Sequence, residues 1–522
     1  MIRKIFWSIV YTLIFLLLLA GEAMTIATVV KLDMLPDLYL VAIIGVFALL
    51  TLLVGILLFG RGRRSSKGKR IVACVLSVLI VCGCAVITTV ALDVMAAIES
   101  TSEQLPEVAT REVYVLADNS AQSLQDTVGY AYGYVKNYDE SCTQQVMGAV
   151  AAETGGEFST AGYTDTFTMV RALLSGRIDA MILNGGFATI LEETEEFVGF
   201  SDKTRILAQV EVTETEEAPE SDPEEEVLPE ESTEPTEATE PVSVEEEIDF
   251  TSLEPFIVYL SGSDSHGKKI VKNGRSDVNI LAVVNPMTKQ VLLLNTPRDY
   301  YVRNSAGGGA RDKLTHCGIY GTKCSMNTLG NLYDTEIEHY VRINFDGFKK
   351  VIDAMGGITV YSDYAFTAIT RTPIKKGENH LSGQEALDFA RERYTLKGGD
   401  NERGKHQMQV ITAVIEKATS GTTIISNYSE ILASVEGMFQ MNIPTELISA
   451  LMKMQLSDMA RWNVVSYAVT GTNSSEECYS MPGTNLSVVV PSQSSVDKAI
   501  RLKDMVFAGE LLTEEVVRGI TE

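Results

Sequence analysis

Three long apolar runs occupy the first hundred residues of the chain. They extend from Ile5 to about Val30, from Tyr39 to Phe59 and from Ile71 to about Ile98. Each is close to the roughly 20 residues that a helix needs to cross a bilayer. Because backbone groups in lipid must satisfy their own hydrogen bonds, these runs predict three spanning helices. We therefore interpret residues 1–100 as a membrane domain whose surroundings are a lipid bilayer.

Charges beside the apolar runs predict their orientation. The connection from Lys31 to Asp37 is short and carries two aspartates, whereas the next connection is densely basic. Its basic residues are Arg61, Arg63, Arg64, Lys67, Lys69 and Arg70. The positive-inside rule places the amino terminus and this basic loop in the cytoplasm, so three crossings leave everything after residue 100 outside. A cleaved signal peptide is the alternative for the first run, but its length and the lack of a small-residue cleavage site argue against it.

The charge balance of the chain comes mainly from one segment. The 522 residues exceed one ordinary domain, and a net charge of −26 argues against a nucleic-acid partner. The segment from Glu211 to Asp249 has no Lys or Arg and is rich in Glu, Pro, Thr and Ser. Such a composition cannot bury enough surface to fold. We expect residues 211–250 to be an acidic, disordered linker that gives reach; a binding role for the acidic run is the weaker alternative.

A small α/β pattern lies between the membrane domain and this linker. Val113 to Leu116 reads as a strand, and Thr166 to Leu174 as a helix with apolar residues on one face. The phrase from Val170 to Ala180 resembles the solute-binding-protein family, in which a similar phrase closes one lobe of a two-lobed ligand clamp. The resemblance covers one lobe's length, so a spacer or interaction domain is the alternative. We expect an extracellular accessory domain at residues 108–210.

A second domain is expected at residues 251–510, followed by a tail at 511–522. Its first strand, Phe256 to Leu260, is followed by a hairpin pattern at Ile280 to Leu294. Arg275 and Asp277 precede this hairpin, and Arg298 with Asp299 follows it. Arginine and aspartate thus gather at strand ends. A guanidinium group can donate two hydrogen bonds to the oxygens of one phosphate, and carboxylates bind Mg²⁺. This placement therefore suits a site for a phosphate and a metal.

Two helices later in this domain are expected to add further arginines. Ser382 and Glu385 form a capping-box pattern for a helix at 383–390, and an extended exit would point Arg391 and Arg393 the same way.

Asp400 is a candidate N-cap for a helix at 401–417, which places Arg403 and Gln407 one turn apart on one face. Five arginines with acidic neighbours would repel one another without an anion between them, and a pyrophosphate is the simplest guest.

Other motifs in this domain have weaker interpretations. The stretch from Gly262 to Lys269 nearly spells a phosphate-binding P-loop, but Lys269 replaces the residue that binds Mg²⁺ and no helical pattern follows. The five histidines show no zinc spacing. Cys317 and Cys324 are close enough in sequence to form one disulfide, and two free thiols are the equal alternative.

At these residues the chain resembles the LytR-CpsA-Psr family of cell-wall glycopolymer transferases. The motifs that carry the resemblance are Gly262 to Ser265, Gly274 to Asp277, Pro297 to Asp299, Asp312 to His316, Asn344 to Phe348, Gly377 to Ala386, Ala390 to Tyr394 and Asp400 to Gln409. His406 departs from the Arg or Asn that the family often has after Gly404 and Lys405, and three spans exceed the family's usual single anchor.

The resemblance implies an α/β/α sandwich around a mixed sheet, with an apolar channel for a polyprenyl chain. Asp264 and Asp277 would then hold Mg²⁺, and the catalytic residues would be Asp277, Arg298 and Asp299. The pyrophosphate-binding residues would be Arg275, Arg298, Lys313, Arg391, Arg393, Asp400, Arg403 and Gln407.

The implied reaction moves a glycopolymer from a polyprenyl-pyrophosphate carrier to peptidoglycan outside the membrane of a Gram-positive cell and releases polyprenyl phosphate. Which polymer is moved, teichoic acid, capsular polysaccharide or another, is left open by the sequence. A hydrolase acting on the same carrier is one alternative function, and a non-enzymatic envelope sensor is another.

Overall fold

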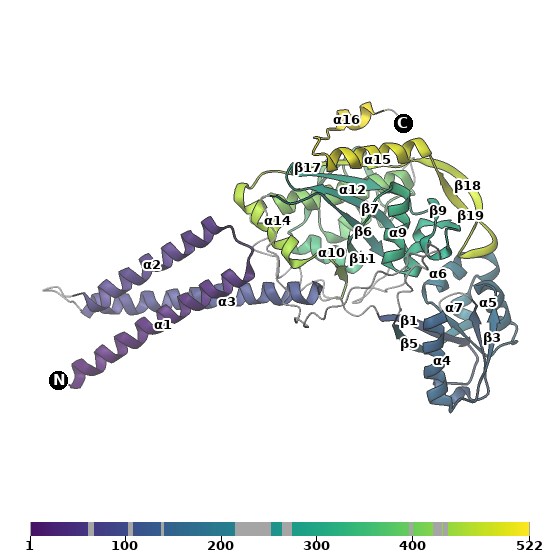
Figure 1. Ribbon diagram of the computed structural model, residues 1–522, viewed down its shortest axis with the longest axis horizontal. Coiled ribbons are helices and arrows are strands. Elements are labelled where there is room, and N and C mark those ends of the chain that lie inside the picture. The colour runs from purple at the N-terminus through teal and green to yellow at the C-terminus, as the bar shows by residue number, and fades with distance from the viewer. Residues whose placement is uncertain are drawn as a thin grey trace, which may run out of the picture. The chain divides into compact units, whose positions relative to one another are not determined.

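The computed structural model describes residues 2–60, 67–102, 108–136, 140–213, 252–263, 274–395, 400–420, 431 and 437–520. These residues belong to two compact units, one formed by Met1–Gln104 with Asp249–Glu522 and the other by Leu105–Ile248 (Figure 1). Of the linker expected at 211–250, residues 211–213 continue a strand and 214–250 lie outside the described residues. Asp264 also lies outside them.

Three helices at the start of the chain are long and apolar enough to cross a membrane. They are α1 (Ile2–Leu32), α2 (Asp37–Phe59) and α3 (Lys67–Ser102). Large apolar side chains face outward, as at Leu38 and Leu49, which are 76% and 68% exposed. Exposing such an apolar surface to water is unfavourable, whereas lipid tails can contact it without this cost. The three expected spans are therefore present as helices, and we interpret them as a membrane anchor.

The accessory unit contains a five-stranded sheet in the order β3-β2-β4-β1-β5. Its strands are β1 (Val108–Leu116), β2 (Ala131–Val135), β3 (Ser159–Tyr163), β4 (Ala180–Leu183) and β5 (Thr204–Thr213). The helices that connect or follow them are α4 (Glu140–Thr154), α5 (Thr166–Leu174), α6 (Gly186–Glu193) and α7 (Phe200–Lys203). Strands β2, β3 and β4 are parallel, and β1 runs antiparallel to β4 and β5.

Local chemistry explains why α5 begins and ends where the sequence predicts. The carboxylate of Asp165 caps the helix by accepting a hydrogen bond from the backbone N–H of Thr168 at 2.7 Å. Gly176, two residues past the last helical residue, has a positive φ of 69°, which stops the helix.

The second domain is built on a six-stranded mixed sheet in the order β16-β11-β6-β7-β8-β17. The strands are β6 (Phe256–Ser263), β7 (Ser276–Asn285), β8 (Gln290–Asn295), β11 (His339–Asn344), β16 (Phe439–Met441) and β17 (Asn463–Ala468). The β11–β6 and β17–β8 pairs are parallel, and the other three pairs are antiparallel.

Helices cover both faces of this sheet, as the α/β/α expectation requires (Figure 1). Residues such as Tyr259, Leu281 and Leu292 pack on one face in a core with helices α9 (Thr322–Tyr333) and α15 (Gln493–Phe507). Their neighbours Ile280 and Leu293 face the other side, against α12 (Asp400–Thr419), while α14 (Thr445–Asp458) packs near the start of β6. Because β7 and β8 are buried on both faces, they read as continuous apolar runs.

Shorter elements complete the domain. They are β9 (Tyr301–Arg303), β10 (Arg311–Lys313), α8 (Leu314–Cys317), α10 (Phe345–Ala354), β12 (Ile358–Ser362), β13 (Phe366–Thr367), β14 (Pro373–Ile374), β15 (Gly377–Leu381), α11 (Gly383–Arg391), β18 (Gly471–Cys478), β19 (Met481–Pro491) and α16 (Glu514–Gly519). The capping box between Ser382 and Glu385 is present at the start of α11.

The end of the chain differs from the tail expected at residues 511–522. Leu512 and Val517 are buried in the same core as α9 and α15. The backbone N–H of Leu512 donates to Oε1 of Gln290 at 3.1 Å, and its carbonyl accepts from Nδ2 of Asn463 at 2.7 Å. The domain therefore continues past residue 510, because this segment supplies part of its core.

Candidate functional site

Two of the predicted catalytic residues meet at one edge of the six-stranded sheet. Asp277 lies at the start of β7 and Arg298 just after the end of β8, and these strands are antiparallel neighbours. The two positions therefore fall at the same edge. Nη1 of Arg298 donates to Oδ1 of Asp277 at 2.8 Å, with both side chains mostly buried. A charge-assisted contact of this kind fixes both groups.

A short hairpin adds further charged groups to this pair. Strand β10 pairs with β9 and places Nζ of Lys313 3.1 Å from Oδ1 of Asp299, which is 3.7 Å from Nε of Arg298. The hydroxyl of Thr315 donates to the same oxygen of Asp277 at 3.2 Å. Carboxylates and cations therefore alternate along this edge of the sheet. Thr315 lies in a motif that the sequence singled out, but sequence reasoning assigned it no role.

A buried carboxylate holds this segment in place. Asp312 is fully buried and accepts the backbone N–H groups of Lys313 at 2.8 Å and Ser480 at 3.1 Å, as well as the Ser480 hydroxyl. Nδ1 of His316 lies 2.7 Å from its Oδ1. Because Lys313 and Thr315 lie between Asp312 and His316, which contact each other, Asp312 positions both of them.

The first turns of α12 form the opposite wall. Arg403 and Gln407 lie one turn apart on this helix, as the sequence predicts, and Gly404 packs against the end of β8. A Cβ at Gly404 would lie 2.3 Å from Nδ2 of Asn295, so a larger residue would force the Asn295 side chain to move. The helix thereby presents Arg403 to the cleft that Arg298 also lines.

These walls enclose a cleft of about 280 Å³. Its lining residues are Asp277, Asn295, Thr296, Pro297, Arg298, Glu402, Arg403, Gly404, Lys405, Gln407, Ala468, Val469 and Thr470. Four of the predicted site residues, Asp277, Arg298, Arg403 and Gln407, are therefore brought together. Sequence reasoning missed Lys405 and Glu402, although both flank the predicted Arg403. It also missed Thr470, because β17 comes close to β8 only in the folded chain.

The other predicted anion-binding groups are not among the residues that line the cleft. Arg391 is the last residue of α11 and not part of an extended exit, and its guanidinium lies 4.2 Å from the centre of the Phe345 ring. Arg393 lies 4.5 Å from the centre of the Tyr394 ring. Both arginines therefore make cation–π contacts. Of the five arginines that were expected to converge, Arg298 and Arg403 line the cleft.

Arg275 and Asp400 have intermediate positions. Arg275 is 7% exposed and lies two residues before Asp277, outside the cleft lining. Asp400 is the first residue of α12, and its side chain lies outside the described part of the structure.

One arginine near this edge was not predicted. Arg342, on β11, is 2% exposed and donates from Nη2 to the carbonyl of Gly274 at 3.3 Å, next to Arg275. Burial lowers the pKa of its guanidinium. Arg342 occupies an inward-facing position of strand β11, and this pattern could have indicated from the sequence that the arginine is buried.

The described residues fit a magnesium ion only in part. Among them there is no group of three or more His, Cys, Asp or Glu side chains that could hold a metal. Mg²⁺ bound with phosphates needs only one or two protein carboxylates, since water and phosphate oxygens complete its coordination. Asp277 meets this requirement at the cleft wall, and the other expected ligand, Asp264, is not described.

Two further expectations concern the surroundings of the cleft. Cys317 and Cys324 are buried free thiols. A hydrogen bond between them lowers the pKa of Cys324 and raises that of Cys317. Pro297, Ala468 and Val469 give the cleft a short apolar wall, and a longer channel for a polyprenyl chain stays a prediction.

The fold and the site define a class of protein, an α/β/α domain with an arginine–carboxylate cleft and apolar helices at the start of the chain. Residues 224–497, which contain the cleft, match the model of the LytR_cpsA_psr family. Because this match spans more than half of the chain, the protein belongs to that family.

Relatives with assigned names match the same region. A polyisoprenyl-teichoic acid–peptidoglycan teichoic acid transferase TagU of Enterococcus faecalis is 36% identical over 204 residues, which is 39% of this chain and 65% of the relative. The TagU of Bacillus subtilis is 33% identical over 201 residues, covering 38% and 63%. The chain thus spans slightly less than two thirds of these relatives. The crystal structure of B. subtilis TagV is 28% identical, covers 50% of this chain and 99% of its own, and gives a TM-score of 0.41.

Proposed function

We propose that this protein is a membrane-anchored phosphotransferase that moves a glycopolymer from a polyprenyl-pyrophosphate carrier to peptidoglycan. The observation that carries the proposal is the cleft in which Arg298, held by Asp277, is joined by Arg403. Two guanidinium groups lining one cleft suit the two phosphates of such a carrier. The names of the TagU relatives support teichoic acid as the polymer.

The location that we propose follows from the charges beside the spanning helices. The amino terminus and the basic loop lie in the cytoplasm, and both later domains lie outside the membrane. ATP is scarce there, so the donor must already carry its own anhydride bond. A polyprenyl-pyrophosphoryl glycan meets this requirement.

In the proposed reaction a hydroxyl of peptidoglycan, by family analogy the muramic acid 6-hydroxyl, attacks the sugar-linked phosphorus. A new oxygen–phosphorus bond forms, the bond to the bridging oxygen of the pyrophosphate breaks, and polyprenyl phosphate leaves with that oxygen. Arg298 and Arg403 bind the phosphate oxygens, on which charge is spread in the transition state, and Gln407 orients them. The catalytic contribution is positioning and charge neutralisation.

The remaining predicted residues support these two arginines. Of the two carboxylates predicted as catalytic, Asp277 lines the cleft, and we assign to it acceptance of the hydroxyl proton. Asp299 instead pairs with Lys313 and fixes Arg298 from behind. We propose that Asp277 and Asp264 also hold Mg²⁺, which when bound neutralises the pyrophosphate.

The test uses the full-length protein in lipid nanodiscs with a lipid-linked glycan, a peptidoglycan oligomer and Mg²⁺. We expect a covalent glycan–peptidoglycan product. Replacing Arg298 with Gln should lower its rate by about 10²-fold to 10³-fold, by analogy with the loss of an oxyanion donor. The exposed Arg303, on the adjacent strand β9, gives the matched control Arg303→Gln, which should retain the rate.

The other outcomes of this assay contradict the proposal in distinct ways. Free glycan phosphate without a covalent product would indicate a hydrolase. Glycolipid binding without any turnover would indicate a sensor. An undiminished rate after chelation of Mg²⁺ would remove the metal from the proposal and leave the transferase assignment intact.

A further inference from the structure

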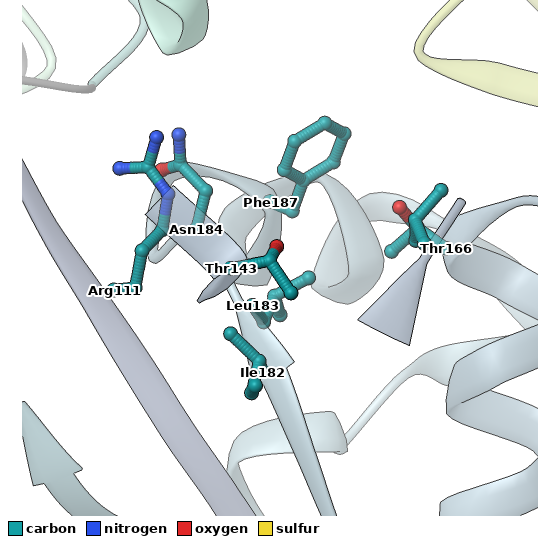
Figure 2. Close-up of a pocket in the computed structure, with 8 residues that line it drawn as sticks. Arg111, Thr143, Thr166, Ile182, Leu183, Asn184 and Phe187 are labelled. Carbon is teal, nitrogen blue, oxygen red and sulfur yellow. The ribbon is translucent and has the colours of Figure 1, made fainter. Parts of the chain in front are cut away.

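A second polar cavity lies in the accessory unit, entirely outside the site described above. It has a volume of about 20 Å³. Its lining residues are Arg111, Val135, Thr143, Thr166, Ile182, Leu183, Asn184 and Phe187 (Figure 2). A space of this size accommodates about one or two water molecules, which is also the size of a small ionic head group.

The position of this cavity follows from the order of the strands. From β2 the chain passes through α4 to β3 on one side, and then through α5 to β4 on the other side of β2. The direction of the connections therefore reverses between β2 and β4. Val135 is the last residue of β2 and Leu183 the last of β4, so the cavity lies at the carboxyl ends of these strands. In open α/β sheets, ligands bind at the carboxyl ends at such a reversal.

The side chains in the cavity are rich in hydrogen-bond donors. Strand β1 pairs with β4 through Glu112 and Leu183, which brings Arg111 beside Asn184. Figure 2 shows the guanidinium of Arg111 and the amide of Asn184 side by side, with their polar ends on the same side. The four polar lining residues are almost completely buried: Arg111 is 4% exposed, Asn184 5%, Thr166 8% and Thr143 9%.

A buried guanidinium determines which kind of ligand such a site accepts. A buried guanidinium attracts an anion and repels a cation. A guanidinium donates through five N–H groups, so an anion can share it with the partner that Arg111 has within the protein. The hydroxyls of Thr143 and Thr166 and the amide of Asn184 add further donors.

The two carboxylates next in sequence to lining residues have other partners. Glu112 accepts from the hydroxyl of Tyr114 and from Nε2 of Gln209, and Asp165 caps α5. Neither is among the lining residues.

From these observations we propose that the accessory unit binds a carboxylate group, presented by a small organic acid or by the end of a larger ligand, between Arg111 and Asn184. One guanidinium matches the single charge and planar shape of a carboxylate. The cavity is too small for a sugar ring, so the carboxylate alone enters it and the rest of the ligand stays outside. Phe187 and Ile182 give the entering group an apolar neighbour.

Equilibrium dialysis of radiolabelled acetate against the full-length protein in nanodiscs tests the proposal. We expect one saturable site per chain in the millimolar range. Arg111→Gln should weaken acetate binding by about 10-fold to 100-fold, as expected for the loss of a hydrogen bond to a charged group. Arg177, an exposed arginine of the same unit, provides the matched control Arg177→Gln, which should bind as the wild type does.

A second variant covers the case in which Arg111→Gln does not fold. Thr143→Val keeps the shape of the side chain, removes one hydroxyl donor and should weaken acetate binding several-fold. A variant with both Arg298→Gln and Arg403→Gln should still bind acetate, which separates this site from the catalytic cleft.

Several results would overturn the proposal. These are the absence of saturable acetate binding, acetate binding that persists unchanged in folded Arg111→Gln or Thr143→Val, and binding that is lost only in the double catalytic variant. Displacement of acetate by equimolar inorganic phosphate would show that the site takes tetrahedral anions, and would contradict a carboxylate site.

Discussion

Asp312 carries a buried charge whose hydrogen bonds reach two parts of the catalytic domain. It joins the Lys313–His316 segment to Ser480, which lies between strands β18 and β19. Lys313 contacts Asp299, and Thr315 contacts Asp277. Asp312 therefore affects the site through these two residues, although it does not line the cleft. It is a positioning residue in the proposed reaction.

We expect Asp312→Asn to destabilise the domain by about 1–3 kcal/mol, because an amide turns an N–H₂ group toward at least one donor that the carboxylate accepted. Thermal unfolding of the purified protein would measure this. The turnover number of transfer should also fall, with a smaller change in KM, since Lys313 and Thr315 lose their support. Asp497→Asn, at an exposed position on α15, is the control. An unchanged melting temperature would show that Asp312 is not an anchor.

His406 is a buried histidine in the same domain. Its side chain is 3% exposed. The centres of the His406 and Phe389 rings are 4.1 Å apart, and Nδ1 of His406 lies 3.1 Å from the carbonyl oxygen of Phe389. Burial lowers the pKa of its imidazole below the ordinary value. The departure from the Arg or Asn that the resemblance led us to expect thus places a neutral ring in the core.

This lowered pKa predicts a dependence of stability on pH. The unfolded chain binds a proton at His406 more readily than the folded chain, so the stabilising contribution is complete above the unfolded pKa of about 6.5 and is lost as pH falls toward the folded pKa. In His406→Asn the fall in melting temperature between pH 8 and pH 5 should be smaller than in the wild type, by about 2–4 °C for a difference of about 1 kcal/mol.

The measurement has an internal control and a known second contributor. At pH 8 the imidazole of His406 is neutral in both the folded and the unfolded chain. Protonation of His406 should therefore contribute nothing to the difference in melting temperature between the two proteins at this pH. Burial also lowers the pKa of His339, so part of the acid sensitivity should remain in His406→Asn. Identical pH profiles for the two proteins would contradict the prediction.

At the scale of elements, α16 and the segment before it supply part of the core that α15 also joins. Leu511 and Leu512 are neighbours in sequence, yet Leu511 is 60% exposed and Leu512 is 1% exposed. The sequence offered no helix long enough to predict here, and the six residues of α16 are stable only because they pack on the domain.

The two leucines provide a matched pair of variants. Leu512→Ala should destabilise the domain by about 2–5 kcal/mol, because it leaves a cavity in the core. Leu511→Ala should change stability by less than about 0.5 kcal/mol. Urea-induced unfolding, monitored by hydrogen exchange of the amides in α15, would measure the change in stability for each variant. Equal effects of the two substitutions would mean that this segment is the tail that the sequence suggested.

The elements around the cleft were predictable to different degrees. The β7–β8 hairpin could be predicted because β-branched and apolar runs flank an Asn–Pro turn, and α11 because of its capping box. The predicted end of α11 was wrong by one residue. That residue is Arg391, and a helical Arg391 stacks on Phe345 of α10, a contact that no local pattern encodes.

At the scale of the whole molecule, the open question is which side of the membrane each part faces. Three apolar helices precede both later domains, and the basic residues lie between the second and third helices. In the topology that we propose, three crossings place the accessory and catalytic domains on the same side, opposite the amino terminus.

Cysteine labelling in intact cells tests this arrangement. Ser201→Cys in the accessory unit and Ser494→Cys on α15 are exposed positions, and both should react with a maleimide that cannot cross membranes. Ser65→Cys in the basic loop should react only after the cells are made permeable. The wild type, with its seven native cysteines, gives the background. Labelling of Ser65→Cys alone in intact cells would invert the proposed topology.

The amino-acid sequence by itself determined the three apolar helices, the layered α/β fold of the catalytic domain and the family, because these depend on hydrophobic period, chain length and motifs with short spacing. It also predicted Asp277, Arg298, Arg403 and Gln407 as site residues, and these four line one cleft. Only the tertiary structure decided that Arg391 and Arg393 stack on aromatic rings, that Leu512 is core, and that Arg111 meets Asn184 at a cavity. These outcomes depend on contacts between segments far apart along the chain, which local patterns do not specify.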